Sequence, residues 1–126
     1  MRFLIVPALL FALAAPVPKY GWVPVKDVTL SLTPSETRYI APLGINGKSR
    51  IDVSSQAAVT FGLYCSSREG CAPLTLGEGV VADSATTDMV PEHGVVVTDD
   101  RTRVLGIIPN RVQVSIFAWR CISNCS

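Results

Sequence analysis

The sequence has a single histidine, His93, and no excess of charge of either sign. One histidine in 126 residues cannot form a histidine-rich metal site, and it disfavours most histidine-based catalysis. Eleven basic residues balance ten acidic ones, so the net charge of +1 gives no electrostatic reason to expect nucleic acid or an anionic membrane as a partner. We therefore expect no nucleic-acid partner, no membrane insertion, no cofactor and no metal.

Long hydrophobic runs are also absent, except at the N-terminus. Residues 3–13 are apolar, follow Arg2, and lead into Ala-Leu-Ala, the small-residue pattern that signal peptidase requires. The run falls far short of the roughly 20 residues that cross a membrane, which argues against a transmembrane anchor. We interpret residues 1–14 as a secretory signal peptide. The mature chain is then expected to begin near Ala15 and to be secreted, either extracellular or periplasmic.

The rest of the sequence lacks helical periodicity, internal repeats and low-complexity tracts. A hydrophobic content of 48% and a charged content of 17% exclude intrinsic disorder. Short stretches of alternating β-branched residues occur instead, separated by glycine, proline and other turn formers. This pattern predicts an all-β fold, an antiparallel β-sandwich of jelly-roll or immunoglobulin-like layout with roughly eight short strands. The expected strands are 28–32, 37–40, 50–53, 58–65, 74–76, 95–97, 104–108 and 111–121.

Residues 15–26 form a proline-rich segment before the expected domain. Three prolines in nine residues prevent a helix or a central strand, so this arm should be extended, polyproline-II-like or an edge strand. It is either a linker or an arm that docks through Tyr20 and Trp22. Residues 27–126 are expected to form a single β-sandwich domain.

Two segments of this domain are expected to connect strands. The turn formers at 98–101 predict a hairpin between the strands at 95–97 and 104–108. Residues 83–89 are expected to form a long loop with at most one helical turn, because the sequence offers a capping aspartate but also two consecutive threonines.

The four cysteines form two close pairs, Cys65 with Cys71 and Cys121 with Cys125. An even number in an exported chain favours disulfide bonds, and spacings of five and three residues differ from the two-residue spacing of zinc knuckles. Turn formers between Cys65 and Cys71 favour local pairing, and strand alternation points Cys65 and Cys121 to different faces. Long-range pairing stays open, because it would stabilise by about 4 kcal/mol against about 2.4 for the short loop.

Alternation also divides the strands into a core face and an outer face. The expected core residues in two of the strands are Val59, Phe61, Leu63, Val112, Val114, Ile116 and Ala118. Tyr64, Phe117 and Trp119 have the opposite parity. Either they form an exposed aromatic patch suited to recognition, or the outer face is itself covered, with Trp119 buried.

Residues for catalysis or metal binding are weakly indicated. No G-x-S-x-G motif accompanies His93, and a loop histidine is usually solvated. The acidic pair Asp99–Asp100, or Asp83 with Asp88, could bind calcium, but paired aspartates in a hairpin more often cap the turn. We therefore expect the protein not to be an enzyme.

The hypothesis that fits best is a secreted, non-enzymatic binding or structural module that recognises a protein or carbohydrate surface, including the case of a host-directed effector. The candidate binding residues are Tyr20, Trp22, Tyr64, Arg68, Glu69, Phe117 and Trp119. The alternative is a secreted hydrolase or a hydrolase inhibitor. A hydrolase would need a pocket with perturbed carboxylates near His93, and an inhibitor would need a rigid protruding loop such as 65–71.

Overall fold

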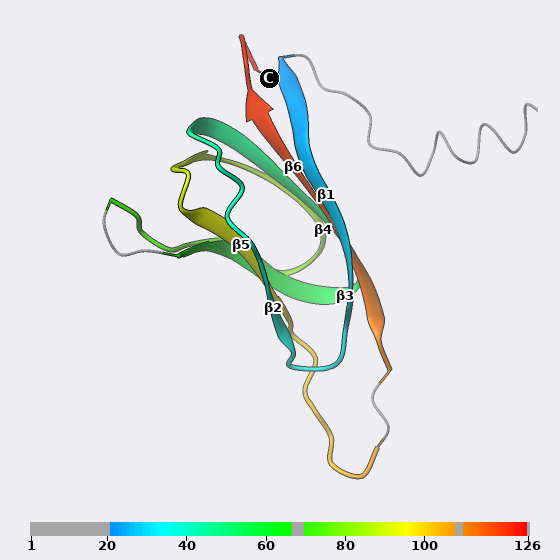
Figure 1. The fold of residues 1–126 in the computed structure, drawn as a ribbon. Helices are drawn as coiled ribbons and strands as arrows, with labels where there is room; N and C mark the ends of the chain where they lie inside the picture. Colours follow the sequence, from blue (N-terminus) through cyan, green and yellow to red (C-terminus); the bar gives the residue numbers. More distant parts are fainter. Residues whose placement is uncertain (1–20, 67–69, 108–109, 126) are drawn as a thin grey trace, which may run out of the picture.

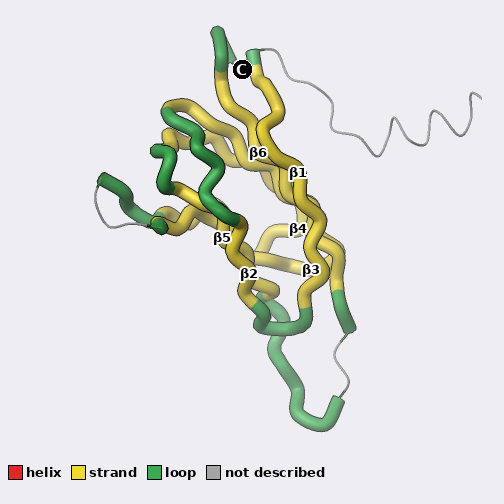
Figure 2. Tube along the Cα trace, viewed as in Figure 1, coloured by secondary structure: helices red, strands yellow, loops and turns green. Residues whose placement is uncertain are grey.

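The computed structural model describes residues 21–66, 70–107 and 110–125. These residues form six strands and no helix, and so no helix long and apolar enough to cross a membrane (Figure 1 and Figure 2). The strands are β1 (Trp22–Leu32), β2 (Thr37–Ile40), β3 (Gly47–Cys65), β4 (Leu74–Met89), β5 (His93–Asp99) and β6 (Val112–Cys121). The expected signal peptide and the candidates Tyr20, Arg68 and Glu69 lie outside the described residues.

All six strands belong to one antiparallel sheet that curls on itself (Figure 1). Its order is β1-β6-β3-β5-β2, and β4 pairs with the other side of β3. The 19-residue β3 makes the curl, because residues 49–55 pair with β6 whereas residues 59–65 pair with β5. We call the two parts the β1–β6 half and the β2–β5 half. Each half contains one end of β3 and one end of β4.

The bend in β3 is built from polar residues that the sequence suggested would lie between two strands. The Ser55 hydroxyl oxygen accepts a hydrogen bond from the N–H of Ala57 at 3.2 Å. The Gln56 side-chain oxygen accepts one from the N–H of Gln113 at 2.9 Å. These side chains take the place of ladder bonds where the chain changes direction, so the two strands expected on either side form one continuous strand.

The described residues therefore contain six strands rather than about eight, and two further expectations are corrected. Residues 83–89 are not a loop, because together with 74–76 they belong to β4 and pair with β3. Residues 104–107 form no strand, because β2 and β3 already occupy both sides of β5. The last residues of the arm expected at 15–26 belong to β1, which begins at Trp22 and lies at an edge of the sheet.

One hydrophobic core lies between the two halves of the curled sheet. Alternation predicted its residues correctly in β3 and β6, because each strand presents every second side chain to the inside. The buried core residues are Leu32, Ile40, Ile45, Ile51, Val53, Val59, Phe61, Leu63, Met89, Val95, Val97, Val112, Val114, Ile116 and Ala118. Because both halves contribute to it, the curl is held by burial of apolar surface.

Candidate functional site

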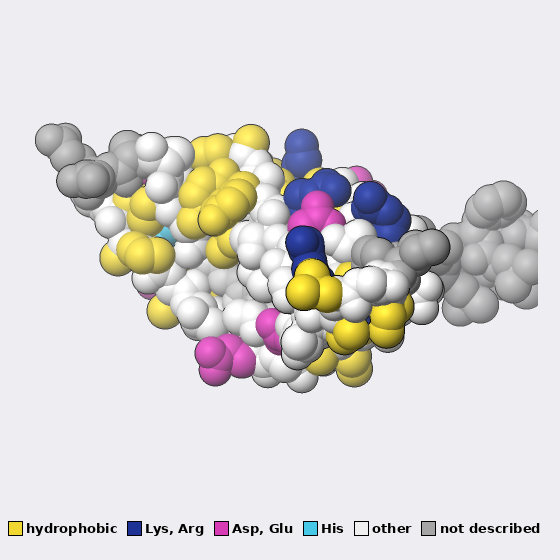
Figure 3. All heavy atoms as spheres, turned by 90° about the horizontal axis from the view of Figure 1, so that it is seen from below, with side chains coloured by type: hydrophobic (Ala, Val, Ile, Leu, Met, Phe, Trp, Pro, Cys, Tyr) yellow, Lys and Arg dark blue, Asp and Glu magenta, His cyan; other side chains and the backbone are white. Residues whose placement is uncertain are grey.

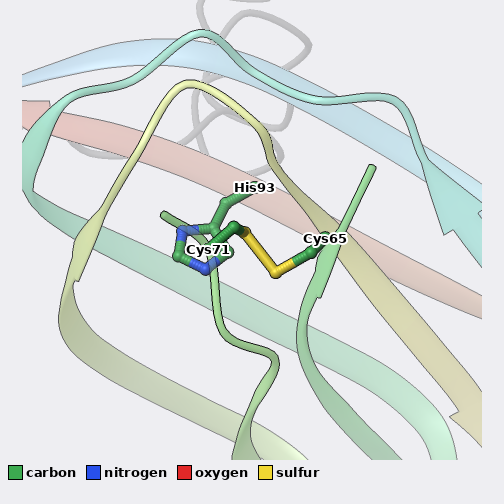
Figure 4. Close-up of side chains that lie close together, drawn as sticks. All are labelled: Cys65, Cys71 and His93. Carbon is green, nitrogen blue, oxygen red and sulfur yellow. A yellow bond between two sulfur atoms is a disulfide. The ribbon is translucent and has the colours of Figure 1, made fainter. Parts of the chain in front are cut away.

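His93, the one histidine, lies beside the Cys65–Cys71 disulfide (Figure 4). Its ring is buried, and both nitrogens are engaged. Nδ1 accepts a hydrogen bond from the N–H of Val90 at 3.0 Å, so the proton is on Nε2, which donates to the carbonyl oxygen of Ala72 at 2.8 Å. The imidazole therefore ties the disulfide loop to the turn before β5.

The residue types of this cluster, two cysteines and a histidine, are those of a metal site, but their donor atoms are not free to bind a metal ion. The sulfur atoms of Cys65 and Cys71 and a ring nitrogen of His93 lie within 4.8 Å of one another. The two sulfurs are bonded to each other, so neither is a thiolate. The Nε2 atom of His93 carries a proton rather than a free lone pair. The arrangement is consequently a structural clamp, and the histidine has no open nitrogen with which to act as a general base.

The other disulfide, Cys121–Cys125, lies at the end of β6. The loop that it closes lies against the start of β1, where the N–H of Ile122 donates to the carbonyl oxygen of Gly21 at 2.9 Å. Trp22, opposite Cys121 in the β1–β6 register, is 5% exposed. Both disulfides are local, the pairing that the loop sequence favoured, and both sit at strand ends.

Trp119 is covered on the outer side of the β1–β6 half. It is 1% exposed and stands outside the main core cluster. Its indole N–H donates to Asp52 Oδ2 at 2.9 Å. Asp52 Oδ1 also accepts from Arg50 Nε at 2.8 Å and from the Ser84 hydroxyl at 2.5 Å. Trp119 is therefore a buried ring at the centre of a small polar cluster, and neither it nor Trp22 has a ring available to a partner.

The outer side of the β2–β5 half has the opposite character. Tyr39 is 65% exposed, and its ring packs edge-to-face against Tyr64, with centroids 5.0 Å apart. The Tyr64 hydroxyl donates to the carbonyl oxygen of Ile40 at 3.0 Å. Tyr64 lies over Gly94, where an added Cβ would come within 2.5 Å of its ring. A glycine at this position of β5 allows the tyrosine to lie flat against the strand.

The two tyrosines form one wall of a shallow groove of about 410 Å³. Val96 of β5 and Gly62 of β3 are register partners at the floor, next to Tyr39 in the row across the sheet. Hydroxyl groups of Thr60 and Thr98 lie on the other side. The Thr60 hydroxyl donates to Asp100 Oδ2 at 2.8 Å and the Thr98 hydroxyl shares a hydrogen bond of 2.8 Å with Thr37, so each oxygen can still accept. The complete lining is Tyr39, Thr60, Phe61, Gly62, Leu63, Tyr64, Pro73, Leu74, Thr75, Val96 and Thr98. No side chain in this lining is charged.

A second exposed feature is the loop after β5, which protrudes beyond the sheet (Figure 1). Its apolar side chains point into solvent, with Leu105 91% exposed and Ile107 65% exposed. Arg101 fixes the base of the loop, because its guanidinium forms an ion pair with the buried Asp99 at 2.7 Å and donates to the carbonyl oxygen of Asn110 at 2.7 Å. The ion pair raises the pKa of Arg101.

Seen from this end of the molecule, hydrophobic and basic side chains lie next to each other (Figure 3). The loop encloses a concavity of about 480 Å³ with Pro34 at one side. This feature replaces the strand that was expected at 104–108.

The structure thus separates the aromatic candidates. Tyr64 lies in the groove, Phe117 is half-buried on the outer side of β6, and Trp22 and Trp119 are buried. Sequence reasoning missed Tyr39, although its alternation with the buried Ile40 placed it on an outer face. Nothing in the sequence could show that β2 and β3 bring Tyr39 to Tyr64, because that contact depends on strand order.

No protein-family model matches the chain, and no curated protein matches it. Among solved structures it is similar to a de novo designed double-stranded β-helix, with 13% identity, a TM-score of 0.37, and coverage of 74% of this chain and 97% of that chain. It is also similar to a protein of Bacillus endospore appendages, described as disulfide-linked pili, with 15% identity, a TM-score of 0.42, and coverage of 86% and 95%. At these identities and TM-scores, neither similarity assigns a family or a function.

Proposed function

We propose that this chain is a secreted, non-enzymatic binding module that recognises a neutral carbohydrate through the Tyr39–Tyr64 groove. The observation that carries the proposal is the exposed ring of Tyr39 packed on the half-buried Tyr64, beside threonine hydroxyls in a groove whose lining has no charged side chain. A tyrosine ring offers an apolar surface for the C–H faces of a sugar, and hydroxyl groups exchange hydrogen bonds with sugar hydroxyls. A lining without charge favours a neutral ligand over a phosphate or an acidic peptide.

Export is part of the proposal. The N-terminal sequence pattern supports it, and so do two disulfides, which persist in oxidising compartments. In the finer description of the fold, the β1–β6 half and the β2–β5 half act as the two layers of a jelly-roll or immunoglobulin-like β-sandwich. The groove then lies on the outer surface of one layer, where it is open to an extended chain.

The test is binding to neutral oligosaccharides of glucose, mannose and N-acetylglucosamine, followed by NMR shift changes on the full secreted chain. At least one sugar should bind, with shifts concentrated at Val96, Thr60 and Thr98. Tyr39→Ala should weaken binding by about tenfold, the effect of losing about 1.4 kcal/mol of contact. Phe117→Ala is the matched control, because it removes a half-buried aromatic ring from the other half of the sheet and should leave binding unchanged.

Two results would count against the groove. One is the absence of binding by any of these sugars up to a dissociation constant of about 1 mM, the weak end of specific recognition. The other is binding that Tyr39→Ala leaves intact. If a protein partner binds the chain and Tyr39→Ala abolishes that binding, the ligand of the groove is a protein surface rather than a carbohydrate.

The exposed loop supports a second candidate function, hydrolase inhibition. Leu105 is presented at 91% exposure on a loop whose base is fixed by the Asp99–Arg101 ion pair, and a preorganised loop loses little entropy on binding. If this proposal is correct, the chain inhibits a secreted protease and Leu105→Glu abolishes the inhibition, whereas Val81→Glu, at an exposed valine of β4, does not. Cleavage of the loop without inhibition would identify it as a substrate and reject this function.

A further inference from the structure

The second part of β4, residues 82–89, is a long regular strand with one open side. It pairs with β3 in unbroken register from Gly47–Met89 to Ser54–Ala82. Among the described residues, no strand pairs with its other side. Within the part of the chain that is described, none of residues 80–89 makes a backbone-to-backbone hydrogen bond outside the strand ladders.

Two local hydrogen bonds show which backbone groups face the open side. Asp83 Oδ1 accepts from the N–H of Ser84 at 2.9 Å, and the Thr87 hydroxyl donates to the carbonyl oxygen of Asp88 at 3.4 Å. Neither of these groups is therefore committed to β3. Backbone direction alternates along a strand, so the N–H and C=O groups of every second residue, including Thr86, face the open side.

The other edges of the sheet are protected. β1 has a proline and a register shift between Pro24 and Lys26, and a proline, a bulge and a lysine are devices that block pairing. β2 has only four residues. The first part of β4 is interrupted by register shifts and by Gly79 with φ of 63°. In the part of the chain that the structure describes, residues 82–89 are the longest stretch of edge strand in unbroken register, and they contain no proline, glycine or bulge.

We propose that residues 82–89 pair antiparallel with the same strand of a second copy of this chain. An antiparallel pair about a two-fold axis places opposite residues on the same face of the sheet. The side chains of Asp83 and Asp88 lie on different faces of the sheet. Asp83 of one copy therefore never lies directly opposite Asp88 of the other. Ala82, Ser84, Thr86 and Asp88 form the exposed outer face, where threonine pairs across strands are favourable.

A second copy fits this edge better than an unrelated partner does. The edge is self-complementary, and the near-neutral net charge of +1 opposes association only weakly. Because each copy has one such edge, the pairing closes at two copies, joining two sheets through β4. The proposal is independent of the groove, which lies on the outer face of the β2–β5 half.

The test compares two substitutions at Thr86, an exposed residue whose N–H faces the open side. Thr86→Pro removes that N–H without removing a bond to β3, whereas Thr86→Val keeps it and keeps a β-branched side chain. Analytical ultracentrifugation of the full secreted chain should show a concentration-dependent dimer for the native protein and for Thr86→Val. The dissociation constant of Thr86→Pro should be at least about tenfold higher, since one central pair of hydrogen bonds is lost.

Amide hydrogen exchange of the native protein keeps the proposal testable if Thr86→Pro does not fold. The N–H groups of Ala82, Thr86 and Asp88 should exchange slowly at high protein concentration and rapidly on dilution, while amides of β6 stay protected throughout. A native protein that is monomeric at every concentration overturns the proposal. So does a dimer that Thr86→Pro leaves unchanged, or an open-ended filament.

Discussion

The outer aromatic residues of the two halves of the sheet differ in exposure. On the β1–β6 half, Trp119 is buried at 1% exposure, and its N–H is held by Asp52. On the β2–β5 half, Tyr39 is 65% exposed and its ring contacts Tyr64. Strand alternation alone gives all of these residues the same description, an aromatic on the face away from the core.

The difference comes from the neighbours on the adjacent strand. Trp119 has Arg50 opposite it in register, and Arg50 forms an ion pair at 2.8 Å with Asp52, the acceptor of the indole N–H. The corresponding neighbours in the row of Tyr39 are Val96 and Gly62, which are too small to cover a ring. Polar residues on the next strand thus engage one outer aromatic residue, and small residues leave the other exposed.

The largest expected effect is loss of the buried ring. Trp119→Ala should reduce the free energy of unfolding by about 3–5 kcal/mol, the usual range for emptying a packed aromatic site. Denaturant unfolding of the oxidised protein measures it. A loss below about 1 kcal/mol, typical of surface substitutions, would mean that the Trp119 ring is not packed and that the two halves are alike.

A smaller effect isolates the hydrogen bond of Trp119 from its packing. Trp119→Phe keeps an aromatic ring but leaves Asp52 Oδ2 without its indole donor, which should cost about 1–3 kcal/mol. Tyr64→Phe is the matched change on the other half, where loss of a bond to a backbone carbonyl should cost about 0.5–1.5 kcal/mol. If Tyr64→Phe costs more than Trp119→Phe in unfolding measurements, the hydrogen bond from Trp119 to Asp52 contributes less to stability than the one from Tyr64 to Ile40.

Local alternation was enough to identify the core of β3 and β6, because burial of one face requires a period of two. It could not show that β3 bends rather than ends, since a bend and a turn use the same polar residues. The strand expected at 104–108 has a strong β propensity but no free neighbour, and Gly106 has φ of 82° there. The loop expected at 83–89 is polar, yet it forms a strand because β3 offers it an unbroken register.

The candidate site was predictable only in part, for a related reason. Tyr64 could be named from its parity, but its partner Tyr39 and the glycine beneath its ring come from other strands. Trp22 and Trp119 have the residue type of a recognition site and were named for it. Whether such a ring is covered depends on side chains such as Asp52, whose position requires the sheet order.

Removal of the exposed ring should have a modest effect on stability. Tyr39→Ala loses an edge-to-face contact with Tyr64 but little buried area, so the free energy of unfolding should fall by about 0.5–1.5 kcal/mol. Measured beside Trp119→Ala, this value gives the contrast between the two halves directly. Equal losses at the two positions would show that Tyr39 is a structural residue, and a binding defect of Tyr39→Ala could then no longer be attributed to the groove.

The smallest expected effect concerns the turn that joins the two halves, between β1 and β2. Hydrogen bonds from the backbone N–H of Thr33 and from Arg38 lower the pKa of Glu36 from 4.5 to about 2. A lowered pKa in the folded state means that folding favours the ionised carboxylate. This contribution is therefore fully present above the unfolded value of 4.5 and is lost as the pH falls toward about 2.

The Glu36→Gln variant tests this contribution, because glutamine cannot ionise and other carboxylates cancel in the comparison with the native protein. The stability difference between the two proteins should be constant above pH 5 or so and should shrink between 4.5 and about 2. Since Glu36 is a surface group, the change should be smaller than any of the aromatic effects. It should also appear first in β2, where amide exchange of Tyr39 should accelerate before that of Trp119. If the stability difference between the two proteins stays constant through this pH range, ionised Glu36 does not stabilise the turn between the β1–β6 half and the β2–β5 half.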